Sequence, residues 1–189
     1  MRVIAGEKRG TRLMDFKGDW IRPTTDKVKE AVFSSIQGEL ANTTVFVDLF
    51  GGSGAMGIEA LSRGVDHVYF FDISRESIAI IKKNLQKTGY TSSAVVRNIS
   101  AEKGIIFLCK NSVKCDMIYM DPPYAEGGEM IALAEIIVEK DILSPEGIII
   151  MEHEKGVVMP ETIQNLIQFK EKQYGGTTIS YYCRKVEDE

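Results

Sequence analysis

A glycine-rich turn preceded by an acidic residue is the feature of this sequence best suited to chemistry. Asp48 comes just before the cluster Gly51-Gly52-Ser53-Gly54, and Gly57 follows three residues later. Glycine lets a backbone approach a ligand closely, and a helix start presents free N–H groups to it. The spacing G-x-G-x-x-G, with Asp72 about twenty residues on, is typical of turns that bind a dinucleotide and its ribose. Taken alone, the turn predicts either a nicotinamide cofactor or S-adenosylmethionine.

The position of Asp48 favours S-adenosylmethionine. A carboxylate at the end of a strand would repel a pyrophosphate, but it could hold the ammonium of a methionine moiety directly or through water. S-adenosylmethionine has that ammonium and no phosphate. The plainer interpretation is a tight turn with no ligand, and it is disfavoured because a glycine cluster weakens the local fold unless something must approach the backbone.

A second group of residues, Asp121-Pro122-Pro123-Tyr124, directly follows the apolar run at 117–120. The two prolines make the turn rigid, so a carboxylate and an aromatic ring are held in fixed relation at the carboxyl end of a strand. This suits an exocyclic amine on a nucleobase: Tyr124 could stack on the ring, while Asp121 and the carbonyl of Pro122 accept the amino hydrogens. These acceptors would localise the lone pair of the amine for in-line attack on the sulfonium methyl group. An ordinary structural turn would explain the glycine cluster alone or the segment 121–124 alone. It does not readily explain the occurrence of both in this order.

The elements that must position these residues follow the alternation typical of a parallel sheet with helices between its strands. The expected strands are residues 45–49, 67–71, 94–97, 116–120 and 147–151. The expected helices are residues 55–63, 74–87, 101–110 and 129–140. After Pro160 we expect one more helix and two strands, the last at 177–183 and antiparallel to its neighbours. The predicted fold is α/β and Rossmann-like, with a mostly parallel seven-stranded sheet and helices on both faces.

The N-terminal residues are predicted to form a small basic hairpin from residues 2–5 and 11–16, followed by a helix at about 26–36. The formal net charge is −4, yet residues 1–29 carry eight basic and four acidic residues. On its own this asymmetry indicates a solvated tail. The length of 189 residues predicts a single domain, with residues 1–40 as an N-terminal appendage and residues 41–189 as the catalytic sheet.

Composition excludes other classes of protein. No apolar run is long enough to cross a bilayer, and residues 1–10 are too polar for a signal peptide, so we expect a cytoplasmic protein with no membrane partner. The three cysteines fit neither a metal site nor a disulfide framework, and the two histidines lack a third ligand at useful spacing. No metal is therefore expected. No cysteine follows a proline, which disfavours the thiolate chemistry used at pyrimidine ring carbons.

Over nearly its whole length the chain resembles the RsmD-like family, bacterial 16S ribosomal RNA guanine-N2 methyltransferases of the class I S-adenosylmethionine-dependent fold. The glycine loop and D-P-P-Y occur in many amino-methyltransferases. The segment Arg22-Pro23-Thr24 and the ending Ser62-Arg63-Gly64 are more specific to this family. The opening Met1-Arg2-Val3-Ile4-Ala5-Gly6 is similar too.

The resemblance implies a role for each candidate site residue. The residues around the methionine end of S-adenosylmethionine would be Asp48, Gly51, Gly52, Ser53 and Gly54. Asp72 would bind the ribose, and Asp121 and Tyr124 would serve the target guanine. Where relatives commonly have an acidic residue near the adenine, this chain has Ser100, whose hydroxyl could still bond the adenine amine. The product would be S-adenosylhomocysteine.

An RNA substrate also gives the basic hairpin a function. Its side chains could hold phosphates through contacts that weaken with salt; they belong to Arg2, Lys8, Arg9 and Arg12. Arg22 would border the active site by resemblance, or would lie beside an ordinary helix start. The resemblance implies 16S RNA within an assembled or nearly assembled 30S subunit as the partner, and we expect a monomer.

Three other functions stay open. A DNA adenine-N6 methyltransferase shares the D-P-P-Y chemistry, but such enzymes usually add a target-recognition domain, for which no stretch here is long enough. A nicotinamide-dependent oxidoreductase would use the G-x-G-x-x-G spacing. A catalytically silent RNA-binding module would keep the basic hairpin without the reaction.

Overall fold

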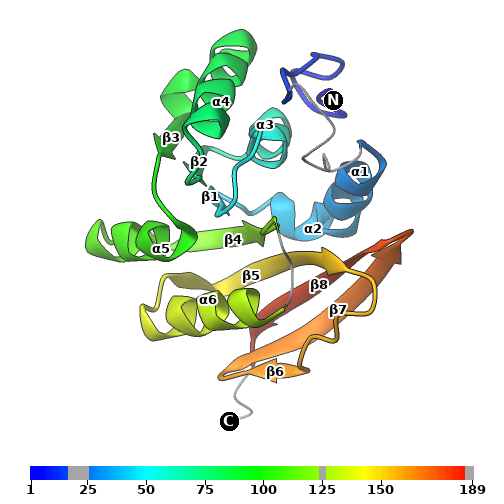
Figure 1. Ribbon diagram of the computed structural model, residues 1–189, viewed down its shortest axis with the longest axis vertical. Helices are drawn as coiled ribbons and strands as arrows, with labels where there is room; N and C mark the ends of the chain where they lie inside the picture. The colour runs from blue at the N-terminus through cyan, green and yellow to red at the C-terminus, as the bar shows by residue number, and fades with distance from the viewer. Residues whose placement is uncertain (17–25, 124–126, 186–189) are drawn as a thin grey trace. The chain divides into compact units, whose positions relative to one another are not determined.

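The computed structural model describes residues 1–16, 26–123 and 127–185 of the chain (Figure 1). Arg22 and Tyr124 therefore lie outside the described residues. The chain divides into two compact units, Met1–Ser100 and Ala101–Glu189. The single domain with an appendage at residues 1–40 stays a prediction.

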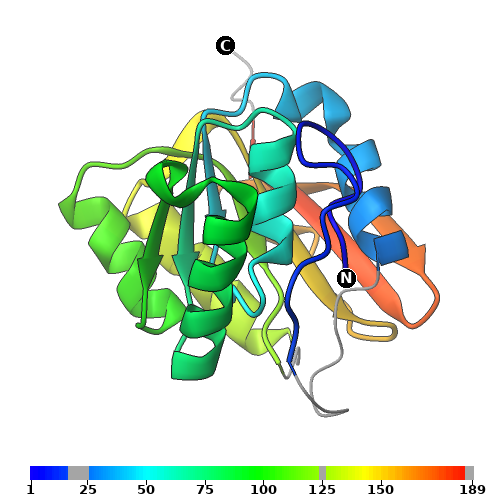
Figure 2. The ribbon, with the colours of Figure 1, turned by 90° about the horizontal axis from the view of Figure 1, so that it is seen from above.

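The first unit contains a three-stranded parallel sheet. Its strands are β1 (Val45–Asp48), β2 (His67–Phe71) and β3 (Ala94–Arg97), in the order β3-β2-β1, with Val47 opposite Tyr69 and Tyr69 opposite Val95. Its helices are α1 (Asp26–Ser35), α2 (Gln37–Leu40), α3 (Ala55–Ser62), α4 (Arg75–Thr88) and the 3-10 turn η1 (Thr91–Ser93). The right-handed crossovers from β1 to β2 and from β2 to β3 place α3 and α4 on the same side of these strands (Figure 2).

Local sequence explains the ends and the packing of these helices. The Ser74 hydroxyl accepts from the Ser77 amide at 3.2 Å and caps α4, and Gly89 ends it with φ of +79° in the left-handed region. Ile78, Ile81 and Leu85 recur at helical spacing and are buried, so α4 is amphipathic. Gly57 lets α3 approach β2, because a Cβ there would lie 2.4 Å from the Phe70 ring.

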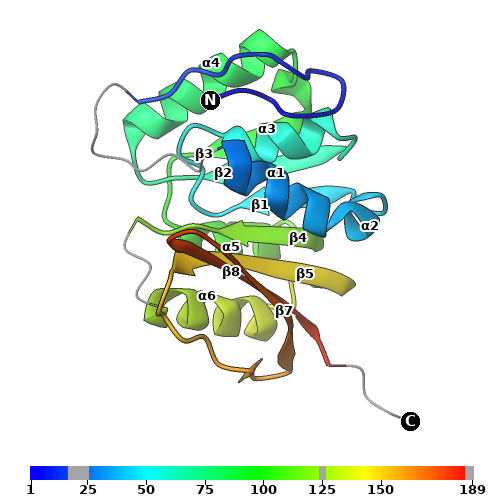
Figure 3. The same cartoon turned by 90° about the vertical axis from the view of Figure 1, so that its right-hand side faces the viewer.

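The N-terminal segment, residues 1–16, passes along α3 and α4 (Figure 3). In place of a full hairpin it makes a single antiparallel bridge between Arg2 and Arg12, with Val3 and Leu13 buried beneath it. Its turn fits tightly onto the end of α3: a Cβ on Gly6 would lie 1.8 Å from the Ser62 carbonyl oxygen. The Ser62 hydroxyl donates to the Ala5 carbonyl at 2.7 Å and accepts from the Lys8 amide at 2.9 Å. Ser62 therefore holds this turn in place.

A buried carboxylate fixes the same segment to α3. Glu59 is fully buried and accepts hydrogen bonds from the amides of Ile4 at 2.8 Å and Ala5 at 3.0 Å. Its oxygens also lie 2.8 Å from Arg63 Nε and 3.4 Å from the ammonium of Lys29, which is buried on α1. Burial lowers the pKa of Lys29, and the Glu59 charge opposes that shift. One acidic side chain thus joins the N-terminal segment, α1 and α3.

The second unit contains a mixed sheet in the order β4-β5-β8-β7-β6. Its strands are β4 (Cys115–Met120), β5 (Leu143–Glu154), β6 (Thr162–Ile163), β7 (Leu166–Tyr174) and β8 (Thr177–Arg184), and its helices are α5 (Ala101–Lys110) and α6 (Gly128–Glu139). Strands β4 and β5 are parallel, whereas β8 pairs antiparallel with both β5 and β7, as expected for the terminal strand.

The fold class predicted from the sequence is confirmed, with two differences in detail. The described residues hold eight strands instead of seven, because the short β6 adds one. The prediction of a helix after Pro160 was wrong, because residues 160–185 form only strands, turns and irregular segments. Ile163, Leu166 and Ile167 have helical spacing, but backbone pairing of β7 with β8 outweighs that local preference.

Within the described part of the chain, none of the helices combines the length and the apolar character that a membrane span requires.

Removing the Glu59 carboxylate is expected to destabilise the protein strongly. Glu59→Ala leaves the buried Lys29 ammonium and two amide N–H groups without this acceptor, which should cost about 3–5 kcal/mol of the free energy of unfolding. Urea denaturation measures the loss. Glu30→Ala, an exposed position on α1, is the matched control and should change stability by less than about 0.5 kcal/mol. A cost for Glu59→Ala as small as that of the control would contradict this role.

Candidate active site

Asp48 ends β1 as a buried carboxylate. Its side chain is only 2% exposed, and Oδ1 accepts a hydrogen bond from the Phe50 amide at 3.3 Å. Burial raises the pKa of Asp48 to about 7, and the negative charge of Asp72 adds to the shift, while the Phe50 hydrogen bond opposes it. A bound cation would stabilise the charged form of Asp48. The carboxylate therefore has the character expected of an ammonium-binding group.

The glycine loop that follows β1 is ordered by its own backbone. The Gly51 amide donates to the Phe71 carbonyl at 2.8 Å, and the Gly54 amide donates to the Gly51 carbonyl at 2.7 Å. Gly54 is the N-terminal cap of α3 with φ of +80°, a conformation that other residues adopt only at a cost. A Cβ on Gly51 would lie 2.8 Å from Ile81 Cδ1, so the loop fits closely over α4. Ser53 is buried within this turn.

Asp72, at the end of β2, joins the glycine loop to the start of α4. Its Oδ2 accepts from the Gly52 amide at 2.9 Å, and its Oδ1 accepts from the Ser74 amide at 2.7 Å. Each carboxylate oxygen has a second lone pair, so ribose hydroxyls could still donate to it. The structure thus brings Asp48, the glycine loop and Asp72 together at the carboxyl ends of neighbouring parallel strands.

Ser100 lies on the loop that follows the third strand of this sheet, β3, and directly precedes α5. Asn98 lies on the same loop, and its amide donates to the Asp72 carbonyl at 2.9 Å. This hydrogen bond fixes the end of β3 against the end of β2. All seven predicted cofactor residues therefore lie at or just after strand ends of the first unit, and their roles toward a cofactor stay predictions.

These residues fit the methionine and ribose ends of S-adenosylmethionine. A buried carboxylate with a raised pKa suits the ammonium, and glycines at positions where a Cβ would be crowded or strained keep the loop backbone accessible. A second acidic side chain stands at the next strand end. None of the loop residues 51–54 has a cationic side chain that could bind a phosphate.

The second group of predicted residues lies in the second unit. Asp121 directly follows β4, which is fully buried over Met117–Met120, and the side chain of Asp121 is partly exposed. Pro122 is buried and Pro123 is exposed. The expected position at the carboxyl end of a strand is confirmed for these three residues, and the rigid turn stays a prediction. Tyr124 lies outside the described residues.

The predicted RNA-binding residues differ in how much of their charge is neutralised. Arg2 forms an ion pair with Asp26 at 3.7 Å, and Lys8 pairs with Glu7 at 2.7 Å. Arg9 and Arg12 are exposed, and neither forms an ion pair within residues 1–16, 26–123 and 127–185. Arg9 and Arg12 are therefore the most available cations of the four. Arg22 lies outside the described ranges.

Two residues of the site were missed from the sequence. Asn84, fully buried on α4, holds the Ser53 carbonyl of the glycine loop at 2.9 Å. Its spacing from Ile81 and Thr88 puts it on the buried stripe of the helix, and a polar residue on that stripe was the available signal. Glu59 is the one charged residue of the buried helix α3, but its partners at Lys29 and in the N-terminal segment are distant in sequence, so the sequence did not identify them.

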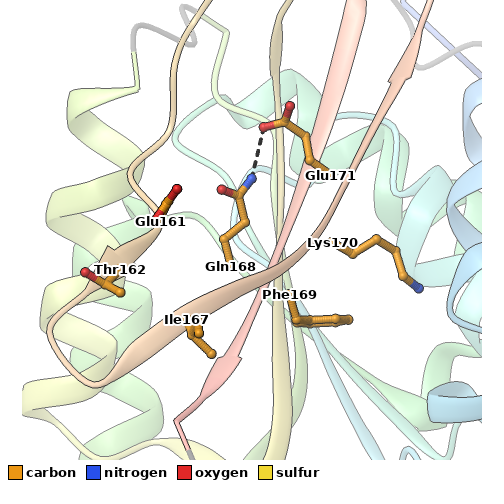
Figure 4. A pocket seen from close by; sticks show the side chains of 7 residues that line it. All are labelled: Glu161, Thr162, Ile167, Gln168, Phe169, Lys170 and Glu171. Carbon is orange, nitrogen blue, oxygen red and sulfur yellow. Dashed lines mark hydrogen bonds between the residues drawn. The ribbon is translucent and has the colours of Figure 1, made fainter.

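A shallow hollow of about 390 Å³ lies elsewhere, on the outer strands β6 and β7 (Figure 4). Residues 161–162 and 167–171 line it, and the amide of Gln168 donates to Glu171 at 2.9 Å across it. It contains none of the predicted site residues. In the second unit β5 and β8 separate these strands from β4, so the hollow is not part of the Asp121 turn.

No cluster of three or more residues suited to a metal ion occurs in the ranges that the structure covers. Cys115 is buried, and burial raises the pKa of its thiol to about 12, which suppresses thiolate formation.

The fold and the glycine loop with its two acidic strand ends define a class I S-adenosylmethionine-dependent methyltransferase fold. A family model described as "Conserved hypothetical protein 95" matches residues 1–183. The chain belongs to this family of RsmD-like methyltransferases.

Relatives and a solved structure agree with this assignment. "Putative rRNA methyltransferase YlbH" of Bacillus subtilis is 39% identical over 185 residues, which cover 98% of this chain and 100% of the relative. "Ribosomal RNA small subunit methyltransferase D" of Haemophilus influenzae is 31% identical over 186 residues, covering 96% and 93% of the two chains. The solved structure of "Putative methyltransferase yhhF from Escherichia coli" has a TM-score of 0.83 at 29% identity and covers 99% of both chains.

The raised pKa of Asp48 predicts a pH-dependent stability that Asp48→Asn should remove. Between its ordinary value of 3.8 and about 7, the folded state binds more protons at Asp48 than the unfolded state does. This residue therefore lowers the free energy of unfolding as pH rises through that window, by at most about 4 kcal/mol for about three pKa units.

Urea denaturation at pH 5 and pH 8 measures this effect. Asp48→Asn keeps an acceptor for the Phe50 amide, so its stability relative to the unmodified protein should be higher at pH 8 than at pH 5. Asp66→Asn, at an exposed position, is the matched control. An equal difference at both pH values for Asp48→Asn would show that burial does not penalise its charge.

Proposed function

We propose that this protein transfers the methyl group of S-adenosylmethionine to the exocyclic N2 amine of a guanine in 16S ribosomal RNA. Membership of the family supports methylation of ribosomal RNA, since relatives bear that function in their names. The observation that carries the proposal is the Asp121-Pro122-Pro123 turn at the end of β4, in a chain that also holds the buried Asp48 beside a glycine loop. The first suits an amine substrate and the second suits the methyl donor.

The residues of the first unit would bind the cofactor. S-adenosylmethionine, when bound, supplies the electrophilic methyl group and leaves as S-adenosylhomocysteine. Asp48 would hold the ammonium, and Gly51–Gly54 would surround the methionine end. Asp72 would accept from the ribose hydroxyls, and Ser100 would bond the adenine amine.

The residues of the second unit would prepare the target base. An aryl amine is a poor nucleophile because its lone pair is delocalised into the ring. The Asp121 carboxylate and the Pro122 carbonyl would accept the two amino hydrogens and draw them out of the ring plane, which localises the lone pair. Tyr124 would stack on the guanine. The amine loses its proton during or after methyl transfer, so no strong base is needed beforehand.

The N-terminal segment would bind the RNA backbone. Arg9 and Arg12 are exposed and unpaired among the described residues, so they can contact phosphates without breaking an ion pair. A base that undergoes chemistry must leave its stack, and a loop nucleotide does so at least cost. We propose an assembled or nearly assembled small subunit as the substrate, modified in the cytoplasm by a monomer.

Adenine-N6 methylation of DNA is the second candidate, because the D-P-P-Y segment suits that amine equally well.

Asp121 is expected to be essential for turnover but not for cofactor binding. Asp121→Ala removes an acceptor used on the reacting amine, so kcat should fall by about a hundredfold or more. N2-methylguanosine formed in small-subunit RNA, measured by mass spectrometry, gives the rate. Asp66→Ala, at an exposed position, is the matched control.

Calorimetric titration of the same variants completes this test. S-adenosylhomocysteine should bind Asp121→Ala and the unmodified protein with similar affinity, whereas NAD should not bind. Unchanged methylation by Asp121→Ala would refute the role of the carboxylate. Binding of NAD alone would point to an oxidoreductase.

Of the four cations proposed to bind RNA, Arg9 and Arg12 are expected to contribute most to RNA affinity. Arg9→Gln with Arg12→Gln should weaken binding and reduce the slope of log K against log salt by about 1.4, since each lost contact to single-stranded RNA removes about 0.7. Arg2→Gln with Lys8→Gln should change the slope less, because these side chains already pair with Asp26 and Glu7.

Filter binding at several salt concentrations measures these slopes. Lys82→Gln with Lys83→Gln, on the exposed face of α4, is the control of equal charge. If the control reduced the slope as much as the Arg9 and Arg12 pair, the N-terminal segment would have no special part in RNA binding.

A further inference from the structure

Asn84 connects two distant segments of the first unit through its side-chain amide. Its Nδ2 donates to the Met14 carbonyl at 2.9 Å and to the Ser53 carbonyl at 2.9 Å, and its Oδ1 accepts from the Met14 amide at 2.7 Å. Both amide hydrogens are used, and the side chain is fully buried on α4. A single buried group therefore fixes the N-terminal segment and the glycine loop to each other.

A second contact joins the same two segments. The Ser53 hydroxyl lies 3.8 Å from the Met1 sulfur, and the Met1 carbonyl accepts from the Leu13 amide at 3.0 Å. Leu13 is buried and precedes Met14 in the chain, so both ends of the N-terminal segment converge on the glycine loop. Any shift of this segment would disturb the hydrogen bonds that hold Ser53.

The outer side of the N-terminal segment carries the cations assigned to RNA. Arg12 is exposed, forms the backbone bridge to Arg2, and lies two residues before Met14. The inner side, through Asn84, contacts the loop assigned to the cofactor. The N-terminal segment thus carries exposed cations suited to RNA and also contacts, through Asn84, the loop proposed to bind the cofactor.

We propose that Asn84 is a positioning residue that couples the N-terminal segment to the glycine loop, so that RNA and cofactor strengthen each other's binding. This inference rests on the proposed function for the identity of the two ligands. An ordered segment keeps Ser53 and its glycine neighbours in place, which lowers the ordering cost for the ligand that binds second. By linkage, the factor by which cofactor raises RNA affinity equals the factor by which RNA raises cofactor affinity.

Amide hydrogen exchange of the glycine loop tests the connection without any ligand. The amides of Gly51, Gly52 and Gly54 are all hydrogen-bonded, so they should exchange slowly in the folded protein. Asn84→Ala should speed their exchange about tenfold or more. Asn111→Ala, which removes an exposed side-chain bond to the Phe107 carbonyl, should leave it unchanged.

A backbone change on the other side of the connection provides an independent variant. Met14→Pro removes the N–H that donates to Asn84, whereas Met14→Ala removes only a side chain that is 45% exposed. Met14→Pro should speed exchange of the loop amides and Met14→Ala should not. The double variant of Met14→Pro and Asn84→Ala should exchange no faster than Asn84→Ala alone. Equal exchange in the two Met14 variants would overturn the proposal even if Asn84→Ala failed to fold. Additive effects in a folded double variant would overturn it as well.

Binding measurements then test the coupling itself. In the unmodified protein, S-adenosylhomocysteine should raise the affinity for a fragment of 16S RNA several-fold, and Met14→Pro should abolish this increase while Met14→Ala retains it. An RNA affinity independent of S-adenosylhomocysteine in the unmodified protein would refute the coupling. Failure to bind S-adenosylhomocysteine at all would instead refute the proposed function, and the exchange experiment would still decide the role of Asn84.

Discussion

The buried Glu59 carboxylate is the interaction on which the first unit depends. A buried negative charge is costly unless it is fully compensated, and here two backbone amides, Lys29 and Arg63 compensate it together. Because these partners come from the N-terminal segment, α1 and α3, all three must be in place at once. Since α3 begins at the glycine loop, the same charge also fixes the start of the candidate cofactor site.

The candidate site uses burial for a different purpose at Asp48. There the desolvated carboxylate lacks a cationic partner among the described residues, so its pKa is raised instead of being held low. A fold that keeps such a group sacrifices stability near neutral pH. Binding of an ammonium would recover that loss, which is a physical reason for a carboxylate at this position in a methyltransferase fold.

Much of this arrangement followed from local sequence, and the rest depended on distant contacts. Helix α4 is specified within one segment by its cap Ser74, its terminator Gly89 and the Ile78–Leu85 stripe. The glycine cluster likewise predicts the loop. Most partners of Glu59 and Asn84 lie far away along the chain, where periodicity does not identify them. The helix expected after Pro160 failed for the same reason, because pairing of β7 with β8 decides that segment. The net charge of −4 likewise does not indicate which cations are available to RNA. Glu7 and Asp26 pair with Lys8 and Arg2, while Arg9 and Arg12 stay exposed.

The reaction that we propose for this protein is methylation of the N2 amine of a guanine in 16S ribosomal RNA. Mapping N2-methylguanine in ribosomes from a strain that lacks the gene, followed by rescue with the purified protein and S-adenosylmethionine, tests it most directly. We expect one guanine to lose its methyl group in the deletion strain and to regain it on small subunits in vitro. An unchanged set of N2-methylguanines in the deletion strain, or methyl transfer to adenine N6 in DNA instead, would contradict it.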